Sequence, residues 1–335
     1  MKKSAKIIFL FLINMILISG CTNQDQPSPY TEILGRPPFA ALGDSIRDDP
    51  RNSELLFRRA ILLNSNNFPE PALADFRKAW SLKKEEKYAL GISTLLMEVH
   101  ADSAILFLDQ ALKELPRSIL LRLSLARSYA MKEQPDSALA VCDRILEINP
   151  QQVDVLKLKA DLLDKKGETA AATSVLEKAY RLVPFDVELN YILALRYAEA
   201  GNPEVLAICD SLLKADPQGT HAEPYYYKGI YYSNTGDRNR ALALFDEAIK
   251  HDYYFLDGYI EKGSLYYEIK RYPEALAVFN LALTISPKYA DTYYWIAKCQ
   301  EATGKKEEAK LNYQRAYHLD KTLTEAKTAA EKIID

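Results

Sequence analysis

The stretch RALALFDEAIKHD at residues 240–252 decides the fold, because it recurs 34 residues later within EALAVFNLALTISP at residues 274–287. In both copies a small residue, a bulky residue four positions later and a second small residue three beyond that share one helical face. The frame extends in both directions, and alanine holds the first small position at Ala72, Ala104, Ala138, Ala172, Ala241, Ala275 and Ala309. The sequence therefore predicts one repeated helical unit over most of the chain.

An upstream half recurs as well. Most units carry an alanine or glycine 12 residues before the first small position, and glycine stands between the two halves at Gly167, Gly236 and Gly304. Each unit is predicted to form two helices, because apolar residues recur every three or four positions and a proline closes several units. Eight units are predicted to begin near residues 53, 85, 119, 153, 187, 222, 256 and 290.

This pattern resembles the tetratricopeptide repeat family over residues 53–323. The resemblance implies an all-α fold, a right-handed superhelical solenoid of about eight helical hairpins. Capping helices are expected at residues 39–52 and 324–335, because the two ends of a solenoid must be covered. The sequence departs from the family pattern at Ile92, where a small residue is expected, and in the fifth unit, which is one residue short.

Residues 1–20 are predicted to be a targeting segment rather than part of the fold. A lysine-bearing start is followed by an apolar run at residues 7–18. This run is too short for a transmembrane helix of about 20 residues but is typical of a secretory signal. The run ends in ISGC at residues 18–21, which resembles a bacterial lipobox and implies cleavage before Cys21 and lipidation of its thiol. The alternative is an ordinary signal peptide. Residues 21–38 are predicted to be a flexible tether.

The charge of the chain bears on its partners and its location. With 43 basic and 46 acidic residues the net charge is −3, which argues against a nucleic-acid partner. Residues 1–20 carry three lysines and no acid, so their removal leaves a charge of −6. An acidic body is not attracted to anionic lipid, and membrane attachment is expected through Cys21 alone. Thr22 follows the cysteine, and the lipobox resemblance then implies the bacterial outer membrane, facing the periplasm.

The sequence carries no pattern typical of an enzyme. No two histidines have the spacing of a helical zinc site, and neither a GxSxG nor a phosphate-binding loop is present. Cys142 and Cys209 hold the bulky core position of their units, and Cys299 lies in a first helix. All three are expected to be buried free thiols. Neither a cofactor nor a metal is expected.

The tyrosines point to a binding surface, since 16 of the 22 lie in residues 222–323. The family resemblance implies that first helices line a concave groove and that particular positions face inward. The partner-binding candidates at these positions are Tyr191, Tyr226, Tyr227, Tyr267, Tyr294, Trp295 and Lys298. Tyrosine and tryptophan supply large, stiff contact areas. The alternative is that these rings only fill space between helices. No unit has the lysine–asparagine pair that would form a carboxylate clamp.

Acidic residues hold the second position of five units, at Asp154, Glu188, Glu223, Asp257 and Asp291. They are interpreted as helix-start residues that complement the helix dipole, in preference to a role in repelling anionic ligands. The predicted function is a non-enzymatic, membrane-tethered scaffold that binds a protein or peptide partner in the groove, in envelope assembly or secretion. A glycan-capture lipoprotein of the outer membrane is the alternative.

Overall fold

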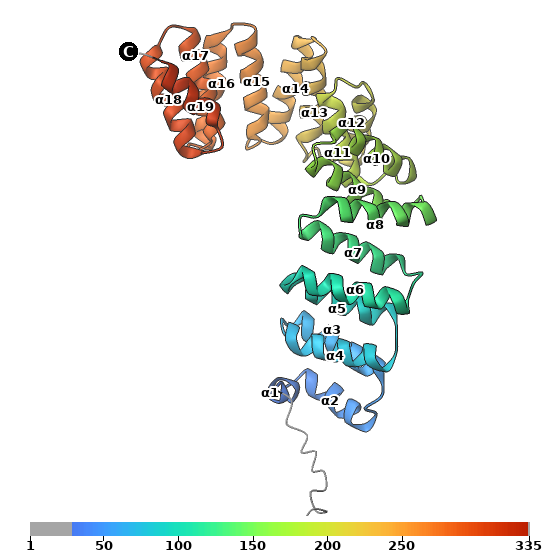
Figure 1. The fold of residues 1–335 in the computed structure, drawn as a ribbon. Helices are drawn as coiled ribbons and strands as arrows, with labels where there is room; N and C mark the ends of the chain where they lie inside the picture. The colour runs from blue at the N-terminus through green and yellow to red at the C-terminus, as the bar shows by residue number, and fades with distance from the viewer. Residues whose placement is uncertain (1–28, 334–335) are drawn as a thin grey trace, which may run out of the picture. The chain divides into compact units, whose positions relative to one another are not determined.

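The computed structural model describes residues 29–333, and this part of the chain contains 19 helices and no strand (Figure 1). The predicted all-α class, built of paired helices with a helix at each end, is confirmed. The described chain divides into two compact units, residues 29–132 and residues 133–333. Within residues 29–333, none of the helices combines the length and the hydrophobicity that a membrane span requires.

The N-terminal unit is a row of helices in which each one packs against the next. Phe39 of α2 lies edge-to-face against Phe68, with 5.6 Å between the ring centres, so α2 covers the start of the row. The helices are α1 (Thr31–Leu34), α2 (Phe39–Asp48), α3 (Ser53–Ser65), α4 (Pro69–Leu82), α5 (Glu86–Val99), α6 (Ala101–Glu114) and α7 (Ile119–Met131).

The C-terminal unit continues the alternation of first and second helices. Its helices are α8 (Pro135–Ile148), α9 (Val153–Lys165), α10 (Thr169–Leu182), α11 (Val187–Glu199), α12 (Glu204–Ala215), α13 (Glu223–Asn234), α14 (Arg238–His251), α15 (Leu256–Glu268), α16 (Tyr272–Ile285), α17 (Ala290–Ala302), α18 (Lys306–Leu319) and α19 (Thr324–Lys332). The first helices α11, α13, α15 and α17 also contact one another in sequence. At the end of the row α19 packs on α18 and buries Ala326, Ala330 and Ile333.

In most hairpins the turn between the two helices contains a residue with positive φ. Gly167, Gly236 and Gly304 take φ values of 79°, 90° and 79°, which suits glycine because it has no Cβ. Asn67 and Lys270 take the same conformation elsewhere, with φ of 64° and 62°. At the three glycine positions, the residue type therefore favours the backbone conformation that ends the first helix.

Two helix crossings of the C-terminal unit leave no room for a Cβ on the first helix. A Cβ built on Gly229 would lie 2.5 Å from the Phe245 ring, and one on Gly263 would lie 2.3 Å from the Phe279 ring. Both phenylalanines are fully buried, so neither ring has free space beside it. The glycines thus let a first helix approach the aromatic residue of its own second helix.

The hairpin that carries Ile92 packs differently. Ile92 is fully buried. Its neighbour Gly91 faces the Phe76 ring of α4, and an added Cβ would lie only 2.7 Å from a ring atom. The close approach on α5 is therefore to the second helix of the preceding hairpin, whereas Gly229 and Gly263 approach the second helix of their own hairpin.

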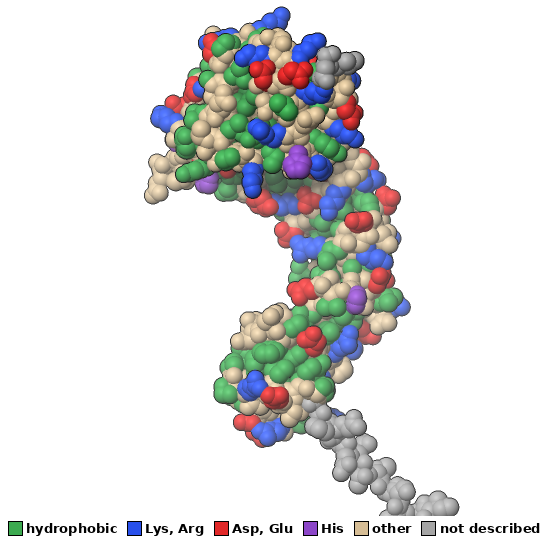
Figure 2. Space-filling view, turned by 90° about the vertical axis from the view of Figure 1, so that its left-hand side faces the viewer, with side chains coloured by type: hydrophobic (Ala, Val, Ile, Leu, Met, Phe, Trp, Pro, Cys, Tyr) green, Lys and Arg blue, Asp and Glu red, His purple; other side chains and the backbone are tan. Residues whose placement is uncertain are grey.

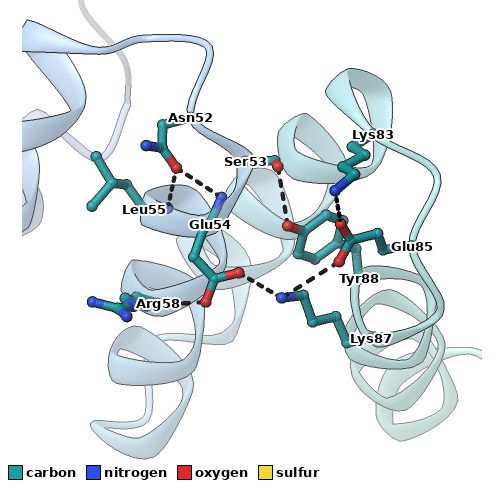
Figure 3. Close-up of polar contacts among 9 residues, drawn as sticks. All are labelled: Asn52, Ser53, Glu54, Leu55, Arg58, Lys83, Glu85, Lys87 and Tyr88. Carbon is teal, nitrogen blue, oxygen red and sulfur yellow. Dashed lines mark hydrogen bonds and ion pairs between the residues drawn. The ribbon is translucent and has the colours of Figure 1, made fainter.

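Polar side chains join α3 to α5 at the surface of the N-terminal unit (Figure 3). The Lys87 ammonium lies 2.5 Å from a Glu54 carboxylate oxygen, and the Tyr88 hydroxyl lies 3.0 Å from the Ser53 hydroxyl. The hydrogen bond from Lys87 lowers the pKa of Glu54. Asn52 caps α3 by accepting hydrogen bonds from the backbone amides of Glu54 and the following residue. These contacts link the neighbouring first helices α3 and α5.

An ion pair is buried between α3 and α4. The Arg59 guanidinium donates two hydrogen bonds to the Asp75 carboxylate, at 2.6 Å from Nε and 2.8 Å from Nη2. The two side chains are only 11% and 9% exposed. Each of these two buried charges is therefore stabilised by the other rather than by water.

Candidate protein-binding surface

All seven predicted partner-binding residues lie on first helices of the C-terminal unit. These helices are α11, α13, α15 and α17, which follow one another in Figure 1. All seven side chains are half-buried. They form two separate clusters rather than one continuous strip.

The first cluster joins α11 to α13. The Tyr191 and Tyr227 ring centres lie 6.3 Å apart, and Tyr227 lies 5.7 Å from Tyr226. Tyr226 continues the contact to Phe255, at 5.1 Å, and to the buried Phe245, at 6.1 Å. Burial raises the pKa of both Tyr191 and Tyr227 to about 12. These phenols stay protonated and can donate hydrogen bonds at neutral pH.

The second cluster joins α15 to α17. The Trp295 ring lies 5.7 Å from Tyr267 and 5.9 Å from Tyr294. The Lys298 ammonium sits 4.4 Å from the Trp295 ring centre, 5.1 Å from Tyr267 and 5.5 Å from Tyr294. Three rings thus surround one cation, in the geometry of cation–π attraction.

These aromatic side chains also pack on the core. Trp295 stacks on Phe279 at 6.1 Å, and Tyr226 contacts Phe245, both of which are fully buried phenylalanines. Each half-buried ring is held in place by its contact with a buried phenylalanine and still presents surface to solvent. Trp295 and Tyr226 therefore do fill space between helices, as the alternative interpretation of the sequence expected. Their exposed surface remains available for binding a partner.

Carboxylates lie beside the first cluster. Asp257 and Glu261 belong to α15, and Asp291 belongs to α17. The Tyr289 hydroxyl donates a hydrogen bond to Asp257 at 3.1 Å. Burial, and then the charge of Asp257, raises the pKa of Glu261. Burial, followed by the charges of Asp320 and Asp257, raises the pKa of Asp291.

We name as the acidic–aromatic surface the set Tyr226, Tyr227, Asp257, Glu261, Tyr289 and Asp291. The tyrosines and carboxylates of this surface influence one another. Burial raises the pKa of Tyr226, and the negative charges of Glu261 and Asp257 raise it further. The sequence analysis did not select Glu261. Its sixth position in the unit, which the family resemblance turns inward, was the available signal.

The acids earlier in the C-terminal unit, on and beside α9 and α11, form ion pairs. The Lys157 ammonium of α9 lies 2.9 Å from both Asp186 and Glu188, and Arg196 of α11 forms an ion pair with Asp164. Glu188 therefore links successive first helices. The five predicted helix-start acids all lie in first turns, of α9, α11, α13, α15 and α17, where they complement the helix dipole.

The three cysteines of the described chain lie in the core. Cys142, Cys209 and Cys299 are buried free thiols, as predicted, and burial raises their pKa to about 11, 12 and 11. Among residues 29–333, no group of three or more histidine, cysteine or acidic side chains could hold a metal ion. Basic and acidic side chains are interspersed over the face that Figure 2 shows.

The raised pKa of Glu261 leads to a prediction about stability. The folded state binds the Glu261 proton more tightly than the unfolded state, so stability is lost as the pH rises through the raised pKa. Glu261→Gln is permanently neutral and should raise the melting temperature at about pH 7. The difference should vanish at about pH 3.5, where the carboxyl is protonated in both states.

Thermal unfolding followed by circular dichroism at the two pH values measures this effect. Glu308→Gln is the matched control, because it makes the same substitution at an exposed position of α18. The control should change the melting temperature little at either pH. A lower melting temperature for Glu261→Gln at neutral pH would contradict the prediction.

Comparison with known proteins identifies the repeat. Models of the tetratricopeptide repeat match residues 95–162 and 290–323, and a TPR repeat model matches residues 263–304. A crystal structure of a tetratricopeptide repeat protein from Parabacteroides merdae ATCC 43184 has a TM-score of 0.55 at 16% identity. The match covers 83% of this chain and 97% of that one, and at this identity it shows the fold alone.

Two curated relatives match parts of the chain. Superkiller complex protein 3 of Homo sapiens is 26% identical over 152 residues, 45% of this chain and 10% of that protein. UDP-N-acetylglucosamine–peptide N-acetylglucosaminyltransferase of Giardia intestinalis is 32% identical over 102 residues, 30% of this chain and 7% of that enzyme. The chain thus spans a small fraction of the length of both relatives. Tetratricopeptide repeats are detected in this chain at residues 95–162 and 263–323.

Proposed function

We propose that this chain is a non-enzymatic scaffold that binds a protein or peptide partner on the first helices α11, α13, α15 and α17. The observation that carries the proposal is the placement of half-buried aromatic residues on four successive first helices. Fixed rings with exposed surface are typical of interface anchors, because little conformational entropy is lost when they bind. The detected tetratricopeptide repeats support a scaffold. Because the chain covers only 7% of the Giardia transferase, that match does not argue for transferase activity.

Photo-crosslinking in the native cell tests this proposal. Replacing Tyr227 or Tyr294 with the aromatic crosslinker p-benzoylphenylalanine retains a ring at each site, whereas alanine would also remove packing. Both variants should give the same crosslinked partner by mass spectrometry. The control position is Leu311 on the second helix α18, which is 64% exposed. Equal crosslinking from Leu311, or crosslinking from Leu311 alone, would reject the first-helix surface. A glycan in place of a protein would favour the glycan-capture alternative.

We further propose that the scaffold is a bacterial envelope lipoprotein, anchored through Cys21 and facing the periplasm from the outer membrane. Cys21 and the predicted signal at residues 1–20 lie outside the described residues. The proposal is supported by the charge, length and composition of residues 1–21. Assembly of envelope or secretion machinery is the class of process that a tethered scaffold of this kind would serve.

Cys21→Ser is expected to move the protein from the membrane fraction to the soluble periplasmic fraction. The effect should be nearly complete, because the lipid on one thiol is the proposed anchor and the rest of the mature chain is acidic. Fractionation after a carbonate wash, with detection by immunoblot, measures it. Cys142→Ser, a thiol buried in α8, is the control and should leave the protein in the membrane. A Cys21→Ser protein that stays membrane-bound would refute the anchor.

A further inference from the structure

We propose that the acidic–aromatic surface binds a positively charged segment of the partner, one that presents lysine or arginine side chains. This inference rests on the proposed function, because it gives the chemistry of the partner that the first-helix surface would bind. It is carried by two features that occur together: carboxylates without cations, and tyrosine rings beside them.

The carboxylates of this surface have no basic partner in the described part of the chain. Glu261 is influenced by Asp257 and Glu268, and Asp291 by Asp320 and Asp257, so in both cases the neighbouring charges are negative. Asp257 accepts its hydrogen bond from the neutral Tyr289 hydroxyl. Like charges held close together in a half-buried setting destabilise the free protein, and a cation placed among them would relieve that repulsion.

The contrast with α9 and α11 shows that the fold does not require unpaired acids. There, Lys157 forms ion pairs with Asp186 and Glu188, and Arg196 forms one with Asp164. Both regions lie on first helices of hairpins in the C-terminal unit. The lysines of α15 and α17 are engaged elsewhere, Lys262 with Asp246 and Lys298 with the Trp295 ring. A partner can therefore supply the cations that the carboxylates of the acidic–aromatic surface lack.

The tyrosines supply the second half of the recognition. Lysine and arginine are attracted to aromatic faces and bury their apolar stems against them. The C-terminal unit already shows this contact with its own cations. Lys298 lies 4.4 Å from the Trp295 ring centre, and Arg271 lies 4.9 Å from that of Tyr266. Tyr226 and Tyr289 lie beside carboxylates and not beside a lysine or arginine of the described chain. A cation that binds these two rings would therefore come from the partner.

The extent of the surface favours a peptide segment over a single ion. Its residues come from α13, α15 and α17, with Tyr289 at the N-cap of α17, and these helices belong to three successive hairpins. A ligand that meets all of them must carry several cationic groups along its length. An extended basic segment of a protein has that chemistry, whereas an anionic partner would be repelled.

Fluorescence anisotropy with short labelled peptides tests the inference on the full-length chain in detergent. The probes are a peptide of alternating lysine and serine, and matched peptides with glutamate or glutamine in place of lysine. The lysine peptide should bind, with an affinity that falls as salt is added. In the double variant Glu261→Gln/Asp291→Asn the dissociation constant should rise about tenfold or more.

A control variant with the same change in net charge separates a local site from bulk attraction. Glu307→Gln/Glu308→Gln removes two charges from the exposed first turn of α18 and should leave the affinity nearly unchanged. Equal loss in both double variants, or equal binding of the glutamate peptide, would overturn the inference. If no lysine peptide binds but Tyr227 still crosslinks a partner, the scaffold proposal stands and only the partner chemistry is wrong.

Discussion

Replacing Arg59 with alanine is expected to destabilise the N-terminal unit by about 3–5 kcal/mol. The guanidinium is 11% exposed and supplies both hydrogen bonds to a carboxylate that is 9% exposed. Without Arg59 the Asp75 charge stays buried and unpaired between α3 and α4. The cost is large because it is the desolvation of Asp75, and not only the loss of the pair.

Urea unfolding followed by circular dichroism measures the change, and hydrogen exchange in α3 and α4 locates it. The double variant Arg59→Met/Asp75→Leu is the control, since it removes both charges and keeps apolar volume. It should recover most of the lost stability. A single variant that costs less than about 1 kcal/mol, the range of exposed pairs, would show that water reaches Asp75 in solution.

The double variant Gly229→Ala/Gly263→Ala is expected to destabilise the C-terminal unit by up to about 4 kcal/mol. Each new Cβ would fall within 2.5 Å of a buried phenylalanine ring, Phe245 or Phe279. Overpacking of this kind costs about 1–3 kcal/mol per site, and occasionally more. Alanine recovers about 1 kcal/mol per site through its better helix propensity. The packing cost is therefore expected to exceed the gain at both crossings.

Smaller partners should rescue the alanines. Elsewhere in the unit Ala160 of α9 occupies the glycine position and Leu176 of α10 occupies the phenylalanine position, and both are buried. Adding Phe245→Leu and Phe279→Leu to the two alanines reproduces that combination in both hairpins. The four-fold variant should unfold at a higher urea concentration than the alanine variant. An alanine variant as stable as the parent chain would contradict the close approach in the structure.

Much of the fold was predictable because it depends on local pattern. The 34-residue spacing of small and bulky residues fixes where helices cross, and first helices begin at Ser53, Ile119, Val153 and Leu256, within the frame read from the sequence. The division of the described chain into two units was not predicted. It depends on the relative density of long-range contacts, which a repeating pattern does not encode.

The candidate surface was predictable only in part. Register placed the aromatic residues on first helices, but their division into two clusters follows from side-chain directions that register does not specify. Glu261 was missed because a single glutamate on a helix is ordinary until its neighbours are known. Arg59 and Asp75 were missed for the same reason, since a separation of 16 residues suggests no pair until α3 and α4 are packed together.

The reactivity of the three buried thiols can be used to measure local opening of the helices that carry them. Cys142, Cys209 and Cys299 sit on α8, α12 and α17, and their raised pKa values keep them protonated and slow to react while the helices are closed. A thiol reagent can therefore label each one only when its own helix opens. The rates of labelling at the three positions would give the local opening of the C-terminal unit near its start, middle and end, with no cysteine introduced.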